Sequence, residues 1–153
     1  MIEITNTTKL KINKKQLTNL SEAFLQTFKK SRVDVSIAIV GDLQIKRLND
    51  KYRGHNTTTD VLSFAGAEWE GNLLGELIIN PREIKRLHKY REILEFVGLK
   101  YPPVKLKSAE TYLFYFILIH GLLHLIGYND ETEEDRLQML QIGRDFLDKH
   151  GII

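Results

Sequence analysis

Residues 112–126, YLFYFILIHGLLHLI, form the most apolar stretch of the chain and decide its fold. Only two histidines and one glycine interrupt the fifteen residues. A helix that crosses a membrane needs about 20 apolar residues, so this stretch is too short to span one. We therefore expect a helix buried in the core of a globular protein, with no membrane partner. Gly127 follows directly and predicts a sharp turn with positive φ at the end of that helix.

The segments on both sides of this helix alternate between strand-like and helix-like patterns. Alternating or β-branched apolar residues predict strands, and apolar residues at helical spacing predict helices. The expected strands cover 1–12, 33–40, 61–64 and 75–79, and the expected helices cover 14–30, a short segment after Asp42, 80–97, 108–126 and 132–149. The mixed order predicts an α+β fold in one domain, residues 1–153. We expect a small mixed four-stranded sheet packed against about five helices, with a central buried helix that carries two histidines.

The composition excludes several classes of site. The 153 residues contain no cysteine, so disulfides, thiolate zinc sites, iron–sulfur clusters and cysteine nucleophiles are all excluded. The first four residues, MIEI, have neither the basic nor the apolar region of a secretory signal. Both features fit a reducing compartment, and we expect a cytoplasmic protein.

Charge is unevenly distributed along the chain. Residues 1–128 contain 19 Lys and Arg against 13 Asp and Glu, whereas residues 129–153 contain 3 against 7. Lys46, Arg47, Lys51 and Arg53 cluster in one short segment, and further cations follow in residues 82–91. Such a basic surface is typical of contact with a phosphate backbone, although ordinary helix solubility explains it as well.

His120 and His124 are four residues apart on the expected central helix, so they project from the same face and can reach one ion. Asp130 follows the Gly127 turn and can return beneath the helix as a third ligand. Three protein ligands with a free fourth position are typical of a catalytic metal site. Two alternatives remain open, since the histidines could be ordinary core residues and Asp130 could cap the last helix.

The same spacing occurs in metalloproteases, which place a glutamate directly after the first histidine as general base. Here that position is Gly121. The spacing therefore favours a metal, whereas the missing base argues against peptide hydrolysis. A metal-dependent peptidase or amidase stays as an alternative.

The run HGLLHLIGYND at residues 120–130 resembles the signature of the YbeY endoribonuclease (rRNA maturation factor) family, His-Gly-x-Leu-His-Leu-x-Gly-Tyr-Asp-His. Residues 48–64, which contain Tyr52-Arg53-Gly54 and TDVLSF, are similar to an upstream motif of the family. LGELII at residues 74–79 is similar to its Leu-Gly-Asp-Ile strand. The three motifs occur in the family's order.

The resemblance implies a single-strand-specific, metal-dependent endoribonuclease of the cytoplasm. Its partners would be ribosomal RNA precursors and the ribosome, with roles in maturation of the 3′ end of small-subunit 16S rRNA and in ribosome quality control, and no DNA is expected. His120, His124 and Arg53 would be catalytic. Arg53, Lys46, Arg47 and Lys51 would bind nucleic acid. A factor that binds the ribosome without catalysis, with a metal that only ties helix to loop, is a further alternative.

The chain departs from the family signature at the third ligand, where Asn129-Asp130 stands in place of Asp-His. His120, His124 and Asp130 would then hold one divalent ion, zinc or another metal. Aspartate is an accepted zinc ligand, but it lowers the net charge of the site and favours oxygen-preferring metals more than histidine does. No residue of the sequence can be named as the general base.

Overall fold

A four-stranded mixed sheet forms one layer of the computed structural model, which describes residues 1–30, 32–67 and 71–152. The strands are β1 (Ile2–Asn6), β2 (Asp34–Ile39), β3 (Val61–Ala65) and β4 (Leu73–Ile79), in the spatial order β1-β2-β4-β3. β1, β2 and β4 run parallel, and β3 pairs antiparallel with β4. The predicted α+β fold with four strands is confirmed.

Alternation along β2 sets the two faces of the sheet. Val35, Ile37 and Ile39 are buried, whereas the residues between them are partly exposed. In the register, Ile37 lies opposite Leu77 and Ile39 opposite Ile79, so apolar side chains of neighbouring strands point to the same face. This face forms the main core of the protein.

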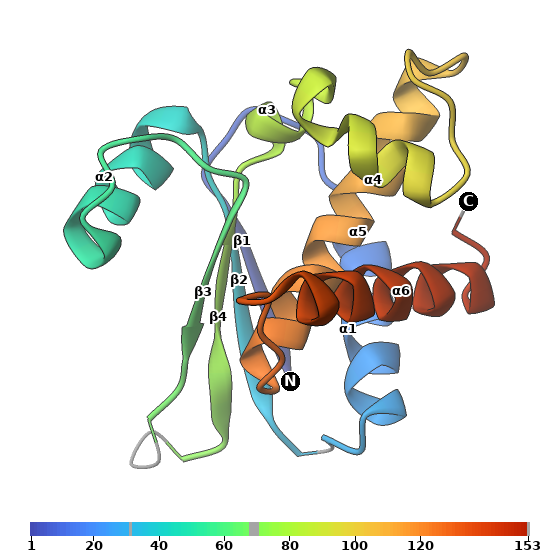
Figure 1. Ribbon diagram of the computed structural model, residues 1–153. Helices are drawn as coiled ribbons and strands as arrows, with labels where there is room; N and C mark the ends of the chain where they lie inside the picture. Colours follow the sequence, from blue (N-terminus) through green and yellow to red (C-terminus); the bar gives the residue numbers. More distant parts are fainter. Residues whose placement is uncertain (31, 68–70, 153) are drawn as a thin grey trace.

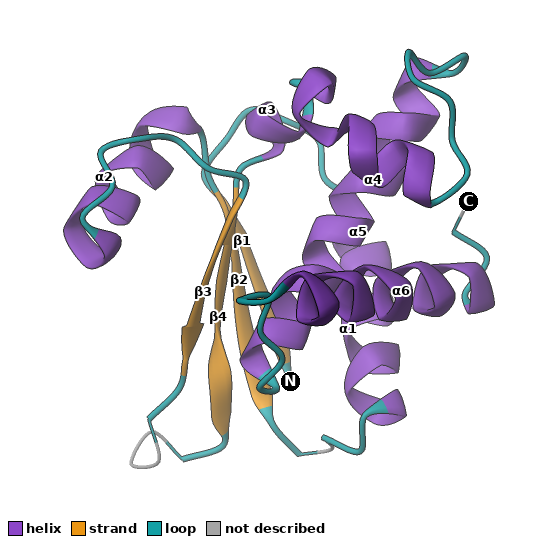
Figure 2. Ribbon diagram, in the orientation of Figure 1, coloured by secondary structure: helices purple, strands orange, loops and turns teal. Residues whose placement is uncertain are grey.

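Helices cover the sheet on both sides (Figures 1 and 2). On the main core face lie α1 (Lys14–Thr27) and α5 (Leu106–Leu125), and α6 (Glu133–Lys149) packs against α5. On the other side lies α2 (Asp42–Arg53), whose Ile45 forms a second small core with the buried Val40 and Leu62. The sheet therefore separates α2 from the other long helices.

Helix α5 is the central element, as the apolar stretch predicts. Twelve of its twenty residues are buried, on all sides of the helix. It nonetheless remains a core helix: in residues 1–30, 32–67 and 71–152 no helix is long and apolar enough to cross a membrane. It also begins at Leu106, two residues before the expected start.

The single helix expected over 80–97 is wrong. The structure has three short pieces there: α3 (Pro81–Ile84), a 3₁₀ helix η2 (Leu87–Tyr90) and α4 (Arg91–Phe96). Arg86 leaves the helical conformation, with φ −82° and ψ 69°, and its guanidinium binds Asp42 of α2 at 2.8 Å and 3.1 Å. A contact 44 residues away in sequence therefore overrides the local helical pattern. The strand expected over 1–12 is also shorter and ends at Asn6.

The contact between β4 and the end of α5 predicts a strict requirement for glycine at position 75. A Cβ there would lie 2.5 Å from the Phe64 carbonyl oxygen and 2.5 Å from Leu125 Cδ2. Gly75→Ala should therefore lower the free energy of unfolding by about 1–3 kcal/mol, because a paired backbone must move. Urea unfolding at pH 7 measures the change.

Gly41→Ala is the matched control, since a Cβ at Gly41 meets nothing within 4 Å. It should lower the free energy of unfolding by no more than about 1 kcal/mol, because Gly41 is the N-cap residue of α2, where alanine is less favourable than glycine. Equal stability of the two variants would contradict the close packing of α5 against the sheet.

Candidate metal centre

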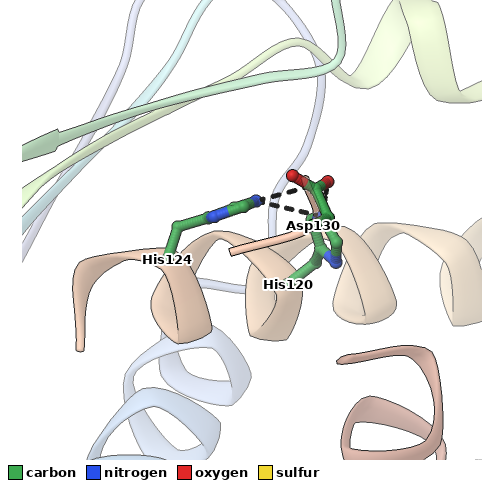
Figure 3. Close-up of side chains that lie close together, drawn as sticks. All are labelled: His120, His124 and Asp130. Carbon is green, nitrogen blue, oxygen red and sulfur yellow. Dashed lines mark hydrogen bonds and ion pairs between the residues drawn. The ribbon is translucent and has the colours of Figure 1, made fainter. Parts of the chain in front are cut away.

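His120, His124 and Asp130 come together in space (Figure 3). The two histidines lie one turn apart on the same face of α5, and Asp130 lies in the loop that leads to α6. One ligand atom from each side chain lies within 4.8 Å of the others. The structure thus brings together the three residues predicted as metal ligands.

The distances between these atoms fit one shared ion. His120 Nε2 and His124 Nε2 are 3.2 Å apart. Asp130 Oδ2 lies 3.6 Å from His120 Nε2 and 3.8 Å from His124 Nε2. Two ligand atoms that each lie about 2.0–2.1 Å from one tetrahedral zinc ion are about 3.3–3.4 Å apart. Two imidazoles and one carboxylate at these separations therefore suit a divalent ion of the zinc type.

The turn after α5 orients the second histidine. Gly127 has a φ of 107°, a conformation that side chains with a Cβ rarely adopt. Its amide donates to the His124 carbonyl at 3.1 Å, and the Tyr128 amide donates to Leu123. The Tyr128 carbonyl then lies 3.1 Å from His124 Nδ1. Because a carbonyl only accepts, Nδ1 carries the proton and Nε2 is free to bind a metal.

Burial keeps His120 in the form that binds metals. The side chain is 18% exposed. Burial, and then the neighbouring His124, lower the pKa of His120, and the negative charges of Asp130 and Asp60 only partly oppose this. A neutral imidazole with a free lone pair is thus favoured near neutral pH.

The three candidate ligands line a cavity of about 350 Å³ between β3, α4, α5 and α6. Arg53, at the last position of α2, lines the same cavity. Ser63 of β3 also lines it and donates from Oγ to the Gly121 carbonyl at 3.4 Å. The remaining lining residues are Thr59, Asp60, Val61, Ile93, Phe116, Ile117 and Leu140.

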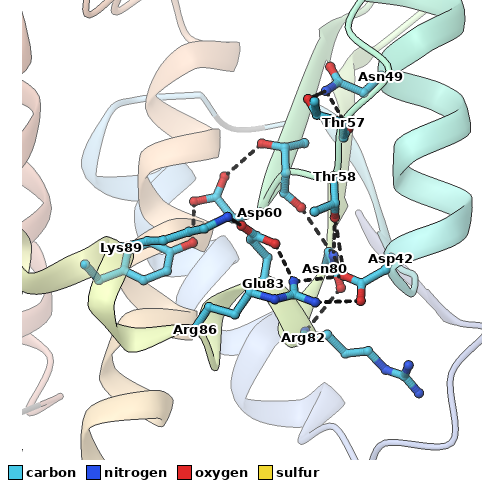
Figure 4. Close-up of polar contacts among 12 residues, drawn as sticks. Asp42, Asn49, Thr57, Thr58, Asp60, Asn80, Arg82, Glu83, Arg86 and Lys89 are labelled. Atoms are coloured by element: carbon cyan, nitrogen blue, oxygen red, sulfur yellow. Dashed lines mark hydrogen bonds and ion pairs between the residues drawn. The ribbon is translucent and has the colours of Figure 1, made fainter.

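Asp60 is the cavity residue that the sequence analysis did not assign. It directly precedes β3, and its Oδ2 accepts a hydrogen bond of 2.8 Å from the Tyr90 hydroxyl (Figure 4). Tyr90 is only 5% exposed, and burial together with Asp60 raises its pKa, so the hydroxyl stays protonated. Asp60 is held in place and adds a second carboxylate to the cavity. The only signal in the sequence is its place in the TDVLSF motif, next to the strand.

The structure separates Arg53 from the other cations predicted to bind nucleic acid. Lys46, Arg47 and Lys51 are exposed on α2, and none of them is among the described residues that line the metal cavity. Lys51 instead places its ammonium 5.0 Å from the centre of the Tyr52 ring. The basic segment therefore divides into one residue at the cavity and three on the outer helix surface.

Gly121 lies in the contact between helix α5 and the sheet. A Cβ at this position would lie 3.0 Å from Leu77 Cδ2 and 3.3 Å from Val61 Cγ2. Leu77 is fully buried. A larger side chain at position 121 would therefore require its neighbours to shift, and close packing disfavours a glutamate there.

Comparison with known proteins agrees with this geometry. The model of the family described as Endoribonuclease YbeY matches residues 3–151. A protein named Endoribonuclease YbeY from Sulfurihydrogenibium is 33% identical over 142 residues, which cover 90% of this chain and 84% of that protein. One of the same name from Thermodesulfovibrio yellowstonii is 37% identical over 110 residues, which cover 70% of this chain and 60% of that protein.

A solved structure has the same fold. The solution structure of a Thermotoga maritima protein superimposes with a TM-score of 0.51 and 26% identity, and the match covers 96% of this chain and 89% of that one. The family model spans nearly the whole chain, including the His120, His124 and Asp130 cluster. This chain therefore belongs to the Endoribonuclease YbeY family.

Proposed function

We propose that the chain is a metal-dependent endoribonuclease that cuts single-stranded RNA. The observation that carries the proposal is the cavity itself, in which two histidines and an aspartate lie together beside Arg53. Membership of a family named for endoribonuclease activity supports RNA as the substrate. The substrates would be ribosomal RNA precursors, met at the ribosome in the cytoplasm, with the 3′ end of 16S rRNA as the site of cleavage.

His120, His124 and Asp130 would hold one divalent ion, with zinc as the first candidate. Such an ion supplies a more acidic water and neutralises charge on a phosphoryl oxygen. The chain's contribution is to hold two neutral imidazoles and one carboxylate at fixed positions. Asp130 is free for this role because Thr132 Oγ1, which accepts from the Asp135 amide at 3.0 Å, caps α6.

Arg53 would bind the scissile phosphate. A guanidinium offers two parallel N–H donors to two phosphate oxygens and so fixes the orientation of the group. Arg53 lies at the end of α2, where Gly54 with φ 73° ends the helix. Lys46, Arg47 and Lys51, on the same helix, would contact the backbone of the RNA further from the cleavage site.

The peptidase or amidase alternative lacks a base at the position that metalloproteases use. A Cβ at Gly121 would lie 3.0 Å from Leu77 Cδ2 and 3.3 Å from Val61 Cγ2, so close packing disfavours a glutamate at this position. The alternative of a purely structural metal is disfavoured by the cavity volume of about 350 Å³, which lies in the range of sites that bind ligands. Both observations favour a nuclease.

The first prediction from this proposal concerns the ligands. The purified protein should bind about one divalent ion per chain, and His120→Ala or His124→Ala should abolish binding, because two remaining ligands seldom hold zinc. Asp130→Ala should weaken metal affinity by at least about tenfold. Metal content by mass spectrometry and a competition titration with a chelating dye measure these effects.

Asn129→Ala is the control for Asp130→Ala. Its Oδ1 accepts from the Glu131 amide at 3.3 Å, so its role is local to the loop. Metal affinity should stay within about twofold of the wild type in this variant. Full metal affinity in Asp130→Ala would show that Asp130 is not a metal ligand and does not replace the family's third histidine.

The second prediction concerns the reaction. The zinc-loaded protein should cut a single-stranded RNA, leave duplex RNA largely intact and leave casein intact. Arg53→Gln should lower kcat/KM for the RNA by roughly 100-fold, the size expected when a donor to a transition-state oxygen is lost, while metal content stays unchanged. Arg91→Gln is the control, because Arg91 is an exposed arginine of α4 that pairs with Glu95.

The three functional alternatives give different results in that assay. Cleavage of casein with no cleavage of RNA would establish the peptidase. A loaded protein that cuts neither substrate would establish the factor without catalysis. Equal activity of Arg53→Gln and Arg91→Gln would remove Arg53 from the reaction.

A further inference from the structure

The carboxyl ends of the three parallel strands meet at one edge of the sheet, beside the residues that lead into β3. The chain leaves β1 toward α1 on the main core face, and it leaves β2 toward α2 on the opposite face (Figure 1). Adjacent parallel strands whose connections diverge to opposite faces leave a crevice between their carboxyl ends, and such crevices are the common ligand sites of α/β sheets. This crevice lies between β1 and β2.

The structure has a groove at this place, with a volume of about 750 Å³. Residues that follow each of the three parallel strands line it. Thr7, Thr8 and Lys9 follow β1, the segment 41–44 and Arg47 follow β2, and Arg82 follows β4. Sequence positions from 7 to 82 are thus gathered by the topology into one surface.

Three cations of this groove have no acidic partner. Lys9, Arg47 and Arg82 are all exposed. Within the described part of the chain, none of the three forms an ion pair. In Figure 4 the Arg82 side chain extends away from the polar network beside it. Three unpaired cations around one groove attract a polyanion.

The one acid of the groove, Asp42, is already neutralised. Its two carboxylate oxygens accept from Arg86 at 3.1 Å and 2.8 Å, and Oδ1 also accepts from Asn80 at 2.8 Å. Arg86 thereby holds the pKa of Asp42 well below its usual range. The pair leaves the charge of Lys9, Arg47 and Arg82 uncompensated.

The groove shares a wall with the metal cavity. Asn80 is fully buried and donates from Nδ2 to Asp42 Oδ1, which lines the groove. The same amide donates to the carbonyl of Thr59 at 3.3 Å, and Thr59 lines the metal cavity. One buried asparagine therefore connects the linings of the two sites.

We propose that this groove binds the phosphodiester backbone of RNA at nucleotides distant from the cleavage site. The proposal rests on RNA being the substrate. The lining contains no aromatic side chain on which a base could stack, so the groove would contact phosphates and not read sequence. Lys9 is thereby added to the cations that contact RNA, and Arg47 and Arg82 are assigned to the groove.

The test measures the binding of a labelled 20-nucleotide single-stranded RNA by fluorescence anisotropy, in EDTA so that no cleavage occurs. The groove variant combines Lys9→Gln, Arg47→Gln and Arg82→Gln. It should bind about tenfold more weakly at low salt. Because each phosphate contact on a single strand contributes about 0.7 to the slope of log affinity against log salt, the slope should decrease by about 2.

The control variant combines Lys29→Gln, Lys100→Gln and Lys149→Gln, three exposed lysines outside the groove. It removes the same charge and should change the salt slope by less than about 0.5. Thermal melting of both variants verifies the fold. Equal losses of RNA affinity in the two variants would overturn the proposal, because only the net charge of the protein would then matter. Unchanged RNA affinity in the groove variant would also overturn it, because the three groove cations would then not contact RNA.

Cleavage by the zinc-loaded wild type is measured separately. A protein that binds RNA through the groove but cuts no RNA would refute the nuclease and support the groove. A protein that cuts RNA while the groove variant binds RNA normally would refute the groove and support the nuclease.

Discussion

The contact between Gly121 of α5 and the sheet is the constraint on which the metal centre depends. Leu77 and Val61 occupy the space that a Cβ at Gly121 would need, so helix and sheet approach more closely than other residues allow. With Gly121 against the sheet, His120 and His124 line the cavity together with residues of β3 and of the loop before it. The close packing of α5 on the sheet thus accounts both for the burial of the helix and for the position of its imidazoles.

The same depth determines the chemistry of the ligands. Burial makes a charged imidazole at His120 unfavourable, so the ring stays neutral and can bind an ion. Neutral imidazoles alone carry no charge to attract a cation, and Asp130 and Asp60 supply negative charge at the cavity. The Gly127 turn is what allows Asp130 to return to the histidines within six residues of His124. Helix, turn and carboxylate form one local unit.

That local character explains what the sequence could predict. The positions of His120, His124 and Asp130 follow from helical periodicity and one glycine, so they are found without knowledge of the rest of the fold. The helix expected over 80–97 fails for the opposite reason. Arg86 and Tyr90 bind Asp42 and Asp60, which are distant in sequence, and no local pattern carries that information.

The same limit applies to the basic residues. Lys46, Arg47, Lys51 and Arg53 form one cluster in the sequence, but α2 divides them between the end of the helix and its outer surface. Only Arg53 reaches the metal cavity. Arg47 lies in one groove with residues that follow β1 and β4 because β1, β2 and β4 pair in parallel. A local sequence pattern does not specify that pairing.

The metal cavity contains two carboxylates, whereas the groove contains three unpaired cations. The metal cavity contains two carboxylates, Asp60 and Asp130, which attract a cation but repel the phosphates of a substrate. A bound divalent ion and Arg53 would offset that repulsion at one phosphate only. Cations placed outside the cavity can hold the rest of a polyanion without competing for the carboxylates. The partly exposed Asp42–Arg86 pair keeps such cations available, because Arg86 occupies the one acid of the groove that could otherwise pair with them. Separation of carboxylates and free cations onto two sides of Asn80 would thus let one small domain bind both a metal and an RNA chain.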